Sequence, residues 1–320
     1  MAYETGSASS ISDLFTKLST FAVANGWTED HAASDRLFLH RNTVYVAFRW
    51  ASASPVNVGI YQALGFISSG TDPGAHTNDS GNGAVSGTDS VLDDERHVPL
   101  VNSTMTYWFF EDDVYIHCVV EVSDGVYRHF GFGELLKLGT WTGGEYCYGW
   151  KLDPAIGTST GAVLSGTSIL LDGLAGGGSM NGYAATIHIE SAPGEGGSSK
   201  WGVIWGNPGA ALGNDTGGNA RVFVQGGFRS GPHAVAFGRF SGATTDGLIP
   251  AYPIHLWYKN PSLPDYYPLG YMEGVRATNI RYIAPEQEVV IGSDTWVFFP
   301  SEQKTAARTD NQGIMYLKVP

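Results

Sequence analysis

The chain has 320 residues, of which 42% are hydrophobic and only 15% are charged, and it contains 43 glycines. This length allows one large or two moderate domains with real cores, so global disorder is excluded. Few charges and many glycines are typical of all-β proteins with many turns. The net charge of −13 and the lack of a basic run argue against a protein that binds nucleic acid tightly. The charge is still compatible with an acidic surface that repels DNA and lets it slide past.

Two further features of composition concern the cellular compartment. Cys118 and Cys147 are the only cysteines, too few for a disulfide framework, so we expect buried free thiols and synthesis in a reducing compartment. The opening residues MAYETGSASS lack a basic region and an apolar region, and no apolar run approaches a membrane span. We therefore expect no classical export signal and no membrane partner.

The first predicted element is an amphipathic helix over Ser10 to Ala24, because its apolar residues repeat at intervals of three and four. Ser10 followed by Asp13 gives a start that resembles a capping box, and Asn25-Gly26 ends the helix. We expect Trp27 to pack back under it. The sequence then predicts a hairpin of Arg36–Leu39 and Thr43–Trp50 that turns near Arg41-Asn42.

Next come an ambiguous segment and a long polar one. Val56 to Ile67 is apolar and is either a strand or a short helical turn at Tyr61 to Leu64. Ser68 to Ser90 has almost no large apolar residue, so it predicts a long surface loop. We interpret this loop as an arm that becomes ordered against a neighbouring subunit.

The central stretch, Thr104 to Tyr148, predicts three consecutive strands that reverse at Glu111–Asp113 and at Ser123–Gly125. Asp124-Gly125 supplies the positive φ of a tight hairpin. In the middle strand apolar residues alternate with Tyr115, His117, Val119 and Glu121, which predicts a strand buried on one side. Residues 131–139 are expected to leave the sheet, and Thr142-Gly143-Gly144 is expected to form a turn.

The rest of the chain adds short strands separated by Gly/Ser-rich segments. These are predicted at Ala184–Ile189, Trp201–Trp205, Arg221–Gln225, Ala234–Phe240, Ile254–Tyr258, Val275–Tyr282, Glu288–Ile291, Thr295–Pro300 and Gly313–Val319. The predicted fold class is therefore mainly β: antiparallel, sandwich-like sheets with one N-terminal helix and long Gly-rich loops. We expect residues 1–150 and 271–320 to share one core, and residues 151–270 to form a Gly-rich β insertion or second lobe.

Two motifs match functional patterns only in their letters. Gly157 to Gly161 reads G-x-S-x-G, but Pro154 interrupts the preceding strand and no helix start follows, so it is a chance match. Asn78, Ser80, Asn82, Gly83 and Asp89 have calcium-loop offsets but too little negative charge. We assign neither a nucleophile nor a metal to these segments.

Acidic and histidine residues of the central stretch give two further candidates. The acids Glu111, Asp112, Asp113, Glu121, Glu134 and Glu145 could supply a glycosidase pair, but three acids at a hairpin tip are more typical of a solvated turn. His117 and His129 lie on facing strands, where polar cross-strand partners explain them as well as a metal does. We therefore predict no catalytic, cofactor-binding or metal-ligating residues, and no cofactor.

Three stretches together resemble a family. Tyr115–Gly149, Glu288–Thr305 (EVVIGSDTWVFFPSEQKT) and the opening Tyr3–Thr28 are similar to structural proteins of tailed-bacteriophage virions, of the kind found in the neck and tail. The resemblance is spread over most of the chain and is weakest from about 151 to 270. It implies many copies in a symmetric ring together with other neck or tail proteins, in a virion built in the bacterial host cytoplasm.

The sequence thus predicts a non-enzymatic virion component of the neck, collar or tail, joined through its long loops. The alternative is a carbohydrate-binding or glycan-cleaving tail-associated protein. It depends on the acidic turn and on the aromatic residues Trp201, Trp205, Trp257, Tyr258, Tyr266 and Tyr267, which would have to form an exposed platform.

Overall fold

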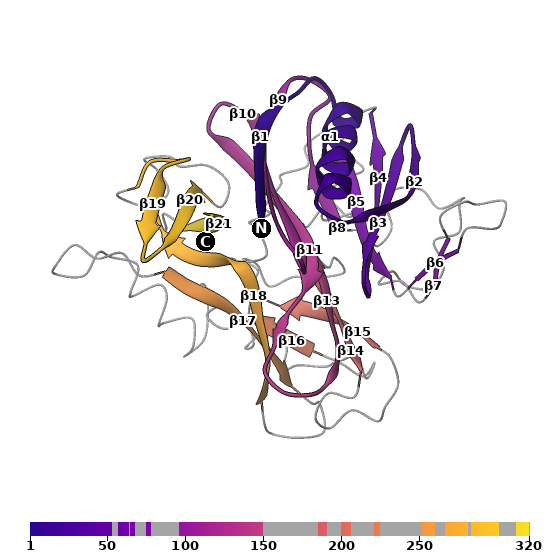
Figure 1. Ribbon diagram of the computed structural model, residues 1–320, viewed down its shortest axis with the longest axis vertical. Coiled ribbons are helices and arrows are strands. Elements are labelled where there is room, and N and C mark those ends of the chain that lie inside the picture. The colour runs from indigo at the N-terminus through magenta and orange to yellow at the C-terminus, as the bar shows by residue number, and fades with distance from the viewer. Residues whose placement is uncertain are drawn as a thin grey trace, which may run out of the picture.

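The computed structural model describes residues 1–52, 57–63, 65–67, 75–77, 96–149, 185–190, 200–205, 221–224, 251–259, 266–280, 283–300 and 312–319. Within these residues the fold is built of strands with a single α-helix, and the pairings are antiparallel apart from one. The predicted fold class, mainly β with one N-terminal helix, is confirmed. Figure 1 shows the central strands between the helix with its neighbouring sheet and the C-terminal strands.

The main sheet has 14 strands, in the order β1-β9-β10-β11-β13-β14-β15-β16-β17-β18-β21-β20-β19, with β12 paired to β18. The one parallel pair is β15 with β16. The bounds are β1 Ala2–Ala8, β9 Met105–Asp112, β10 Tyr115–Ser123, β11 Val126–Glu134, β12 Leu136–Lys137, β13 Thr142–Tyr148, β14 Ala185–Glu190, β15 Lys200–Trp205, β16 Arg221–Val224, β17 Ala251–Lys259, β18 Tyr266–Asn279, β19 Glu288–Ile291, β20 Asp294–Pro300 and β21 Gln312–Val319.

A second sheet has the order β2-β3-β4-β5-β8, and a third joins β6 to β7. Their bounds are β2 Thr28–Ala33, β3 Arg36–Arg41, β4 Val44–Ala51, β5 Asn57–Ala63, β6 Gly65–Ile67, β7 Ala75–Thr77 and β8 Arg96–Pro99. The predicted hairpin is confirmed, with Asn42 in its turn at a φ of 52°. The ambiguous apolar segment is a strand, β5, followed by β6.

The helix α1, Ile11–Ala24, lies where its apolar periodicity places it. The Asp13 backbone N–H donates to Ser10 Oγ at 3.2 Å, so Ser10 is the N-cap. In a capping box the Asp13 carboxylate would accept from the backbone N–H of Ser10. Here it accepts instead from the backbone N–H of Ser9, one residue earlier, at 2.8 Å. Trp27 is buried under the helix and meets Phe132 edge-on, as expected.

The three central strands, β9, β10 and β11, form the predicted meander, with β10 between the other two. The prediction that β10 is buried on one side is wrong, because all residues from Tyr115 to Val120 are buried. One face, with Ile116 and Cys118, packs on α1 and the second sheet. The opposite face, with Val119, packs on the C-terminal strands. An alternating pattern could not show this, since both sets of side chains are covered.

Each face of the meander has its own hydrophobic core. The first core joins the apolar stripe of α1 to Phe48 and Phe130, and Phe15 stacks on Trp50 with centroids 4.7 Å apart. The second core lies between the meander and β18, β20 and β21, where Phe110 stacks on Tyr316 at 5.0 Å. The long meander therefore fixes both the helix and the C-terminal strands.

The segment after β11 differs from its prediction in two places. Residues 131–139 were expected to leave the sheet, but Gly131–Glu134 complete β11 and pair with β13, and Leu136–Lys137 pairs with β18 as β12. Thr142-Gly143-Gly144 is not a turn but the start of β13, where a register shift against β14 accompanies positive φ at Gly143 (106°) and Gly144 (110°). Glycines that indicated a reversal instead form a bulge inside a strand, because neighbouring strands on both sides pair with it.

The described strands of the middle segment belong to the same sheet as the rest. Ile187 of β14 and Leu256 of β17 lie in one hydrophobic cluster with Tyr316. The division into a 1–150 plus 271–320 core and a 151–270 lobe stays a prediction. The G-x-S-x-G segment, the calcium-like loop and the predicted strand Ala234–Phe240 lie outside the described residues. Of the predicted loop 68–90, only β7 is described, and it is a strand.

Candidate functional site

The acidic hairpin tip is held by one arginine. Arg41 donates to Glu111 Oε1 at 2.7 Å, to Asp113 Oδ1 at 2.6 Å and to the carbonyl oxygen of Asn25 at 2.8 Å. Glu111 is buried, and this burial raises the pKa of its carboxyl against the opposing effect of Arg41. The guanidinium group donates to both carboxylates and so joins them. The tip therefore joins the second sheet to the meander.

The other acids of the predicted cluster have separate partners. Glu121 accepts from the Gly125 backbone N–H at 2.8 Å, Lys137 Nζ donates to Glu134 at 2.6 Å, and the N-terminal amine lies 3.7 Å from Asp112. Glu145 is buried against His188 Nδ1 at 2.8 Å, and this bond contributes to a lowered pKa of Glu145, against the opposing effect of its burial. The structure brings Glu111 and Asp113 together on Arg41. It also places Glu134 opposite Glu145 in the β11–β13 register, where Lys137 and His188 are their respective partners.

His117 and His129 are each hydrogen bonded to a tyrosine from another strand. His117 Nδ1 lies 2.9 Å from the Tyr148 hydroxyl, and His129 Nδ1 lies 2.8 Å from the Tyr316 hydroxyl. The two tyrosine side chains are near neighbours, since each contributes to the pKa shift of the other. At the ends, His117 Nε2 lies 2.8 Å from the Glu273 carbonyl oxygen, and His129 Nε2 lies 2.8 Å from the Pro300 carbonyl oxygen.

We refer to Glu273 O, His117, Tyr148, Tyr316, His129 and Pro300 O as the His–Tyr chain. It crosses the interface between the meander side (β10, β11 and β13) and the C-terminal strands (β18, β20 and β21). Both histidines and both tyrosines are fully buried. Burial lowers the pKa of His117 to about 4 and that of His129 to about 4, and it raises the pKa of Tyr148 and of Tyr316.

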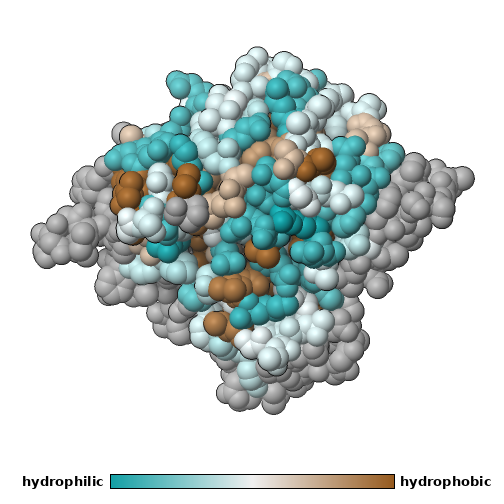
Figure 2. All heavy atoms as spheres, in the orientation of Figure 1, coloured by the Kyte–Doolittle hydropathy of each residue, from teal (hydrophilic) through white to brown (hydrophobic). Residues whose placement is uncertain are grey.

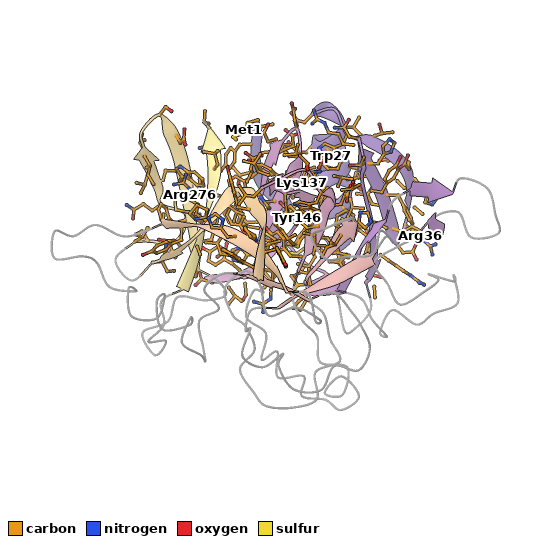
Figure 3. The ribbon with its side chains drawn as sticks, turned by 90° about the horizontal axis from the view of Figure 1, so that it is seen from below. Met1, Trp27, Arg36, Lys137, Tyr146 and Arg276 are labelled. Carbon is orange, nitrogen blue, oxygen red and sulfur yellow. The ribbon has the colours of Figure 1, made fainter. Side chains whose placement is uncertain are left out.

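Two neighbours complete this cluster. Tyr115 stacks on His117 with centroids 4.6 Å apart, and Tyr146 lies parallel to Tyr148 at 6.4 Å. The hydroxyls of Tyr115 and Tyr146 are buried and have no hydrogen-bond partner among the described residues. Figure 3 labels Tyr146 near the middle of the molecule, among side chains from both halves. Gly131 leaves the necessary space, since a Cβ there would lie 2.7 Å from His117 Nδ1.

The aromatic residues proposed as a glycan platform are described only in part. Tyr267 is partly buried and packs against the core between the meander and the C-terminal strands, and Trp257 is also partly buried. The side chains of Trp201, Trp205, Tyr258 and Tyr266 lie outside the described part of the structure. Tyr267 and Trp257 therefore do not form an exposed platform.

The most exposed apolar residues of the described sheets lie at the β19 edge. Val290 and Val319 are 68% and 50% exposed, and both are in register with Thr295, so they lie in one row on one face. Ile291 follows at 40% exposure. Figure 2 shows hydrophobic residues on this part of the surface, at the left of the view. We refer to Val290, Ile291 and Val319 as the β19 edge patch.

Other sheet edges carry residues that discourage strand addition. The edge strand β2 contains Glu29, Asp30 and His31, and β8 ends at Pro99. At the other end of the main sheet, Lys318 Nζ lies 4.5 Å above the Tyr3 ring of β1. The β19 edge has no proline or lysine within its four residues, and its one charged residue, Glu288, is paired with Lys318 Nζ at 2.7 Å.

No protein-family model matches the sequence, and no curated protein matches it. Among the residues that the structure describes, no three His, Cys, Asp or Glu side chains gather as metal ligands. The described helix is not long and apolar enough to cross a membrane. Both cysteines are free and buried, as expected from their place in the central strands.

Sequence reasoning identified His117 and His129 but missed the tyrosines that hydrogen bond to them. Tyr148 ends the stretch that was expected to close with a turn, and Tyr316 lies in the last strand. The sequence offers one signal, the alternation that places Tyr146 and Tyr148 on the same face as each other. That this face meets Tyr316 follows only from the packing of β21.

Proposed function

We propose that this protein is a non-enzymatic structural component of a tailed-bacteriophage virion, present in several copies in the neck, collar or tail. The observation that carries the proposal is the β19 edge patch, a group of exposed apolar residues beside the Glu288–Lys318 ion pair in a strongly acidic chain. Edge strands with exposed apolar residues pair with further chains unless charges, prolines or covering segments prevent it. A second copy of the chain is the occupant expected in a symmetric ring.

The engagement of the carboxylates also supports a structural role. A glycosidase needs two carboxylates that face a sugar, whereas Glu111 and Asp113 face Arg41. The resemblance of the opening, central and closing stretches to neck and tail proteins supplies the class of assembly. The proposed partners are copies of the chain and other neck or tail proteins, and the proposed location is the virion.

The test is the assembly state of the purified protein and of particles that contain it. Electron microscopy and analytical ultracentrifugation should show a closed ring of several copies for the unmodified chain. Val290→Lys combined with Val319→Lys places two charges at the edge and should yield subunits that are folded but do not assemble. Val23→Lys is the matched control, since Val23 is 49% exposed on α1, outside the patch, and assembly should persist.

Two results would contradict the proposal. One is an unmodified chain that stays a monomer and is absent from particles. The other is specific binding on a glycan array that is lost in the Glu111→Gln and Asp113→Asn variants, which would favour the carbohydrate-active alternative. If the Val290→Lys and Val319→Lys double variant still assembles, the interface does not include the β19 edge patch.

A further inference from the structure

A second group of exposed apolar residues lies at β12. Leu136 is 41% exposed and Leu138 is 48% exposed. The Leu138 backbone N–H donates to the Leu269 carbonyl oxygen at 2.8 Å, which continues the pairing of β12 with β18. Alternate residues of an extended segment lie on the same face, so both leucines are on one face and Lys137 is on the other. We refer to Leu136 and Leu138 as the β12 patch.

The usual arrangement, with apolar residues inside and polar residues outside, is reversed at β12. Lys137 Nζ donates to Glu134 Oε1 at 2.6 Å and to the Gly143 carbonyl oxygen at 3.0 Å, and it lies 5.8 Å from the centroid of the Trp141 ring. Trp141 belongs to the core between the meander and the C-terminal strands. Folding alone favours leucine against such a core and lysine in water. Local departures of this kind are expected at sites that serve another purpose.

The β12 patch and the β19 edge patch belong to different parts of the main sheet. β12 pairs with β18 at Gly270 and Tyr271, whereas β19 is joined to β18 only through β20 and β21. The other exposed large apolar residues of the described chain, Met1 and Val23, lie singly, before β1 and on α1. Each copy of the chain therefore carries two different apolar patches.

The described charges beside the β19 edge patch include more carboxylates than cations. The carboxylates are those of Glu286, Glu288 and Asp294. Of the cations, Lys318 Nζ donates to Glu288 at 2.7 Å, and the Arg276 guanidinium lies 4.4 Å from the centroid of the Trp296 ring of β20. Two such patches placed against each other would bring the surplus carboxylates together, and like charges across an interface disfavour a contact.

The charges beside the β12 patch are balanced instead. Lys137 is bonded to Glu134, and Glu145 on the neighbouring β13 is buried against His188. A β19 edge patch that approaches the β12 patch of another copy meets no surplus of negative charge and lies beside a lysine. The charge distribution therefore favours contact between unlike patches over contact between two β19 edge patches.

We infer that the β19 edge patch of one copy docks on the β12 patch of the next copy, so that neighbouring copies are joined head to tail. This inference rests on the proposed function, in which several copies form a ring. A contact between unlike patches leaves one patch of each kind open at the ends of a row of copies, and the row closes into a ring where the rotation between neighbours permits. A contact of the β19 edge patch with itself would end at a dimer.

The first test mixes two full-length double variants. Val290→Lys with Val319→Lys keeps the β12 patch, and Leu136→Lys with Leu138→Lys keeps the β19 edge patch. Each variant alone should associate on the order of a hundredfold more weakly than the unmodified chain, because two apolar side chains leave the contact. Mixed in equal amounts, the two variants should form a dimer with one copy of each and nothing larger in analytical ultracentrifugation. Val23→Lys, the matched control, should assemble as the unmodified chain does.

The second test is disulfide cross-linking, which replaces only one apolar side chain in each subunit. Both native cysteines are buried, so an introduced surface thiol is the one that reacts. Under mild oxidation, Val290→Cys subunits mixed with Leu138→Cys subunits should form linked dimers that contain one of each. Neither kind of subunit alone should cross-link to the same extent.

Efficient cross-linking of Val290→Cys subunits alone would overturn the inference, because the β19 edge patch would then face its own copy. A leucine double variant that assembles as the unmodified chain does would also overturn it, while the ring of the proposed function would stand. A ring that needs both patches but is absent from virions would support the inference and contradict the proposed location. An unmodified chain that stays a monomer would contradict both.

Discussion

Acidification from pH 8 to pH 5 should destabilise this protein through its two buried histidines. Burial lowers the pKa of each from 6.5 to about 4, so the unfolded chain binds protons in this range and the folded chain scarcely does. A depressed folded pKa gives stability that is complete above the unfolded value and is lost as pH falls toward the folded value. The loss therefore begins near pH 6.5 and continues toward about pH 4.

The magnitude follows from linkage. Two protons bound only by the unfolded chain give a slope of about 2.7 kcal/mol per pH unit below pH 6, since each unit of pKa is about 1.4 kcal/mol. Integrated from pH 8 to pH 5, the two histidines remove about 4 kcal/mol. This is a large part of the roughly 5 to 15 kcal/mol by which domains are stable.

The assay is urea unfolding followed by tryptophan fluorescence at half-unit steps of pH. His117→Gln and His129→Gln should each reduce the dependence by about half, whatever their effect on absolute stability. Tyr146→Phe should keep the full dependence. Comparison among variants matters because the raised pKa values of Glu111 and Glu273 act in the opposite direction. A free energy of unfolding that is flat from pH 8 to pH 5 would refute the reasoning, as would histidine variants with the full dependence.

Three further changes test the packing. Arg41→Ala should cost about 3 kcal/mol because it leaves the buried Glu111 carboxylate without its partner, whereas Asp113→Asn, at the exposed end of the same arginine, should cost less than about 1 kcal/mol in urea unfolding. Gly131→Ala should lower stability by roughly 1 to 3 kcal/mol, since its Cβ would press on His117, and an unchanged melting temperature would show that the cluster can yield. Ser10→Ala should cost about 1 kcal/mol through loss of the cap of α1, and Ser9→Ala should cost less, both measured by thermal unfolding.

The sequence by itself determined the elements that depend only on neighbouring residues. The apolar period and the Ser10 cap specify α1, and Asp124-Gly125 specifies the tight turn between β10 and β11. The β3–β4 hairpin, with Asn42 at positive φ, follows from the same kind of signal. These features depend on residues within a few positions of one another, so a single sequence contains all the information they require.

The tertiary structure alone decided what covers each face and which distant residues meet. Period-2 alternation indicated one buried face for β10, but the C-terminal strands cover the other, because its Tyr115, His117 and Val119 pack against them. Gly143-Gly144 has the residues of a turn, yet pairing with β14 makes it a bulge. The His–Tyr chain needs Tyr316 from the last strand beside Tyr148, and such a contact is created by the folding of the sheet upon itself, which no local periodicity encodes.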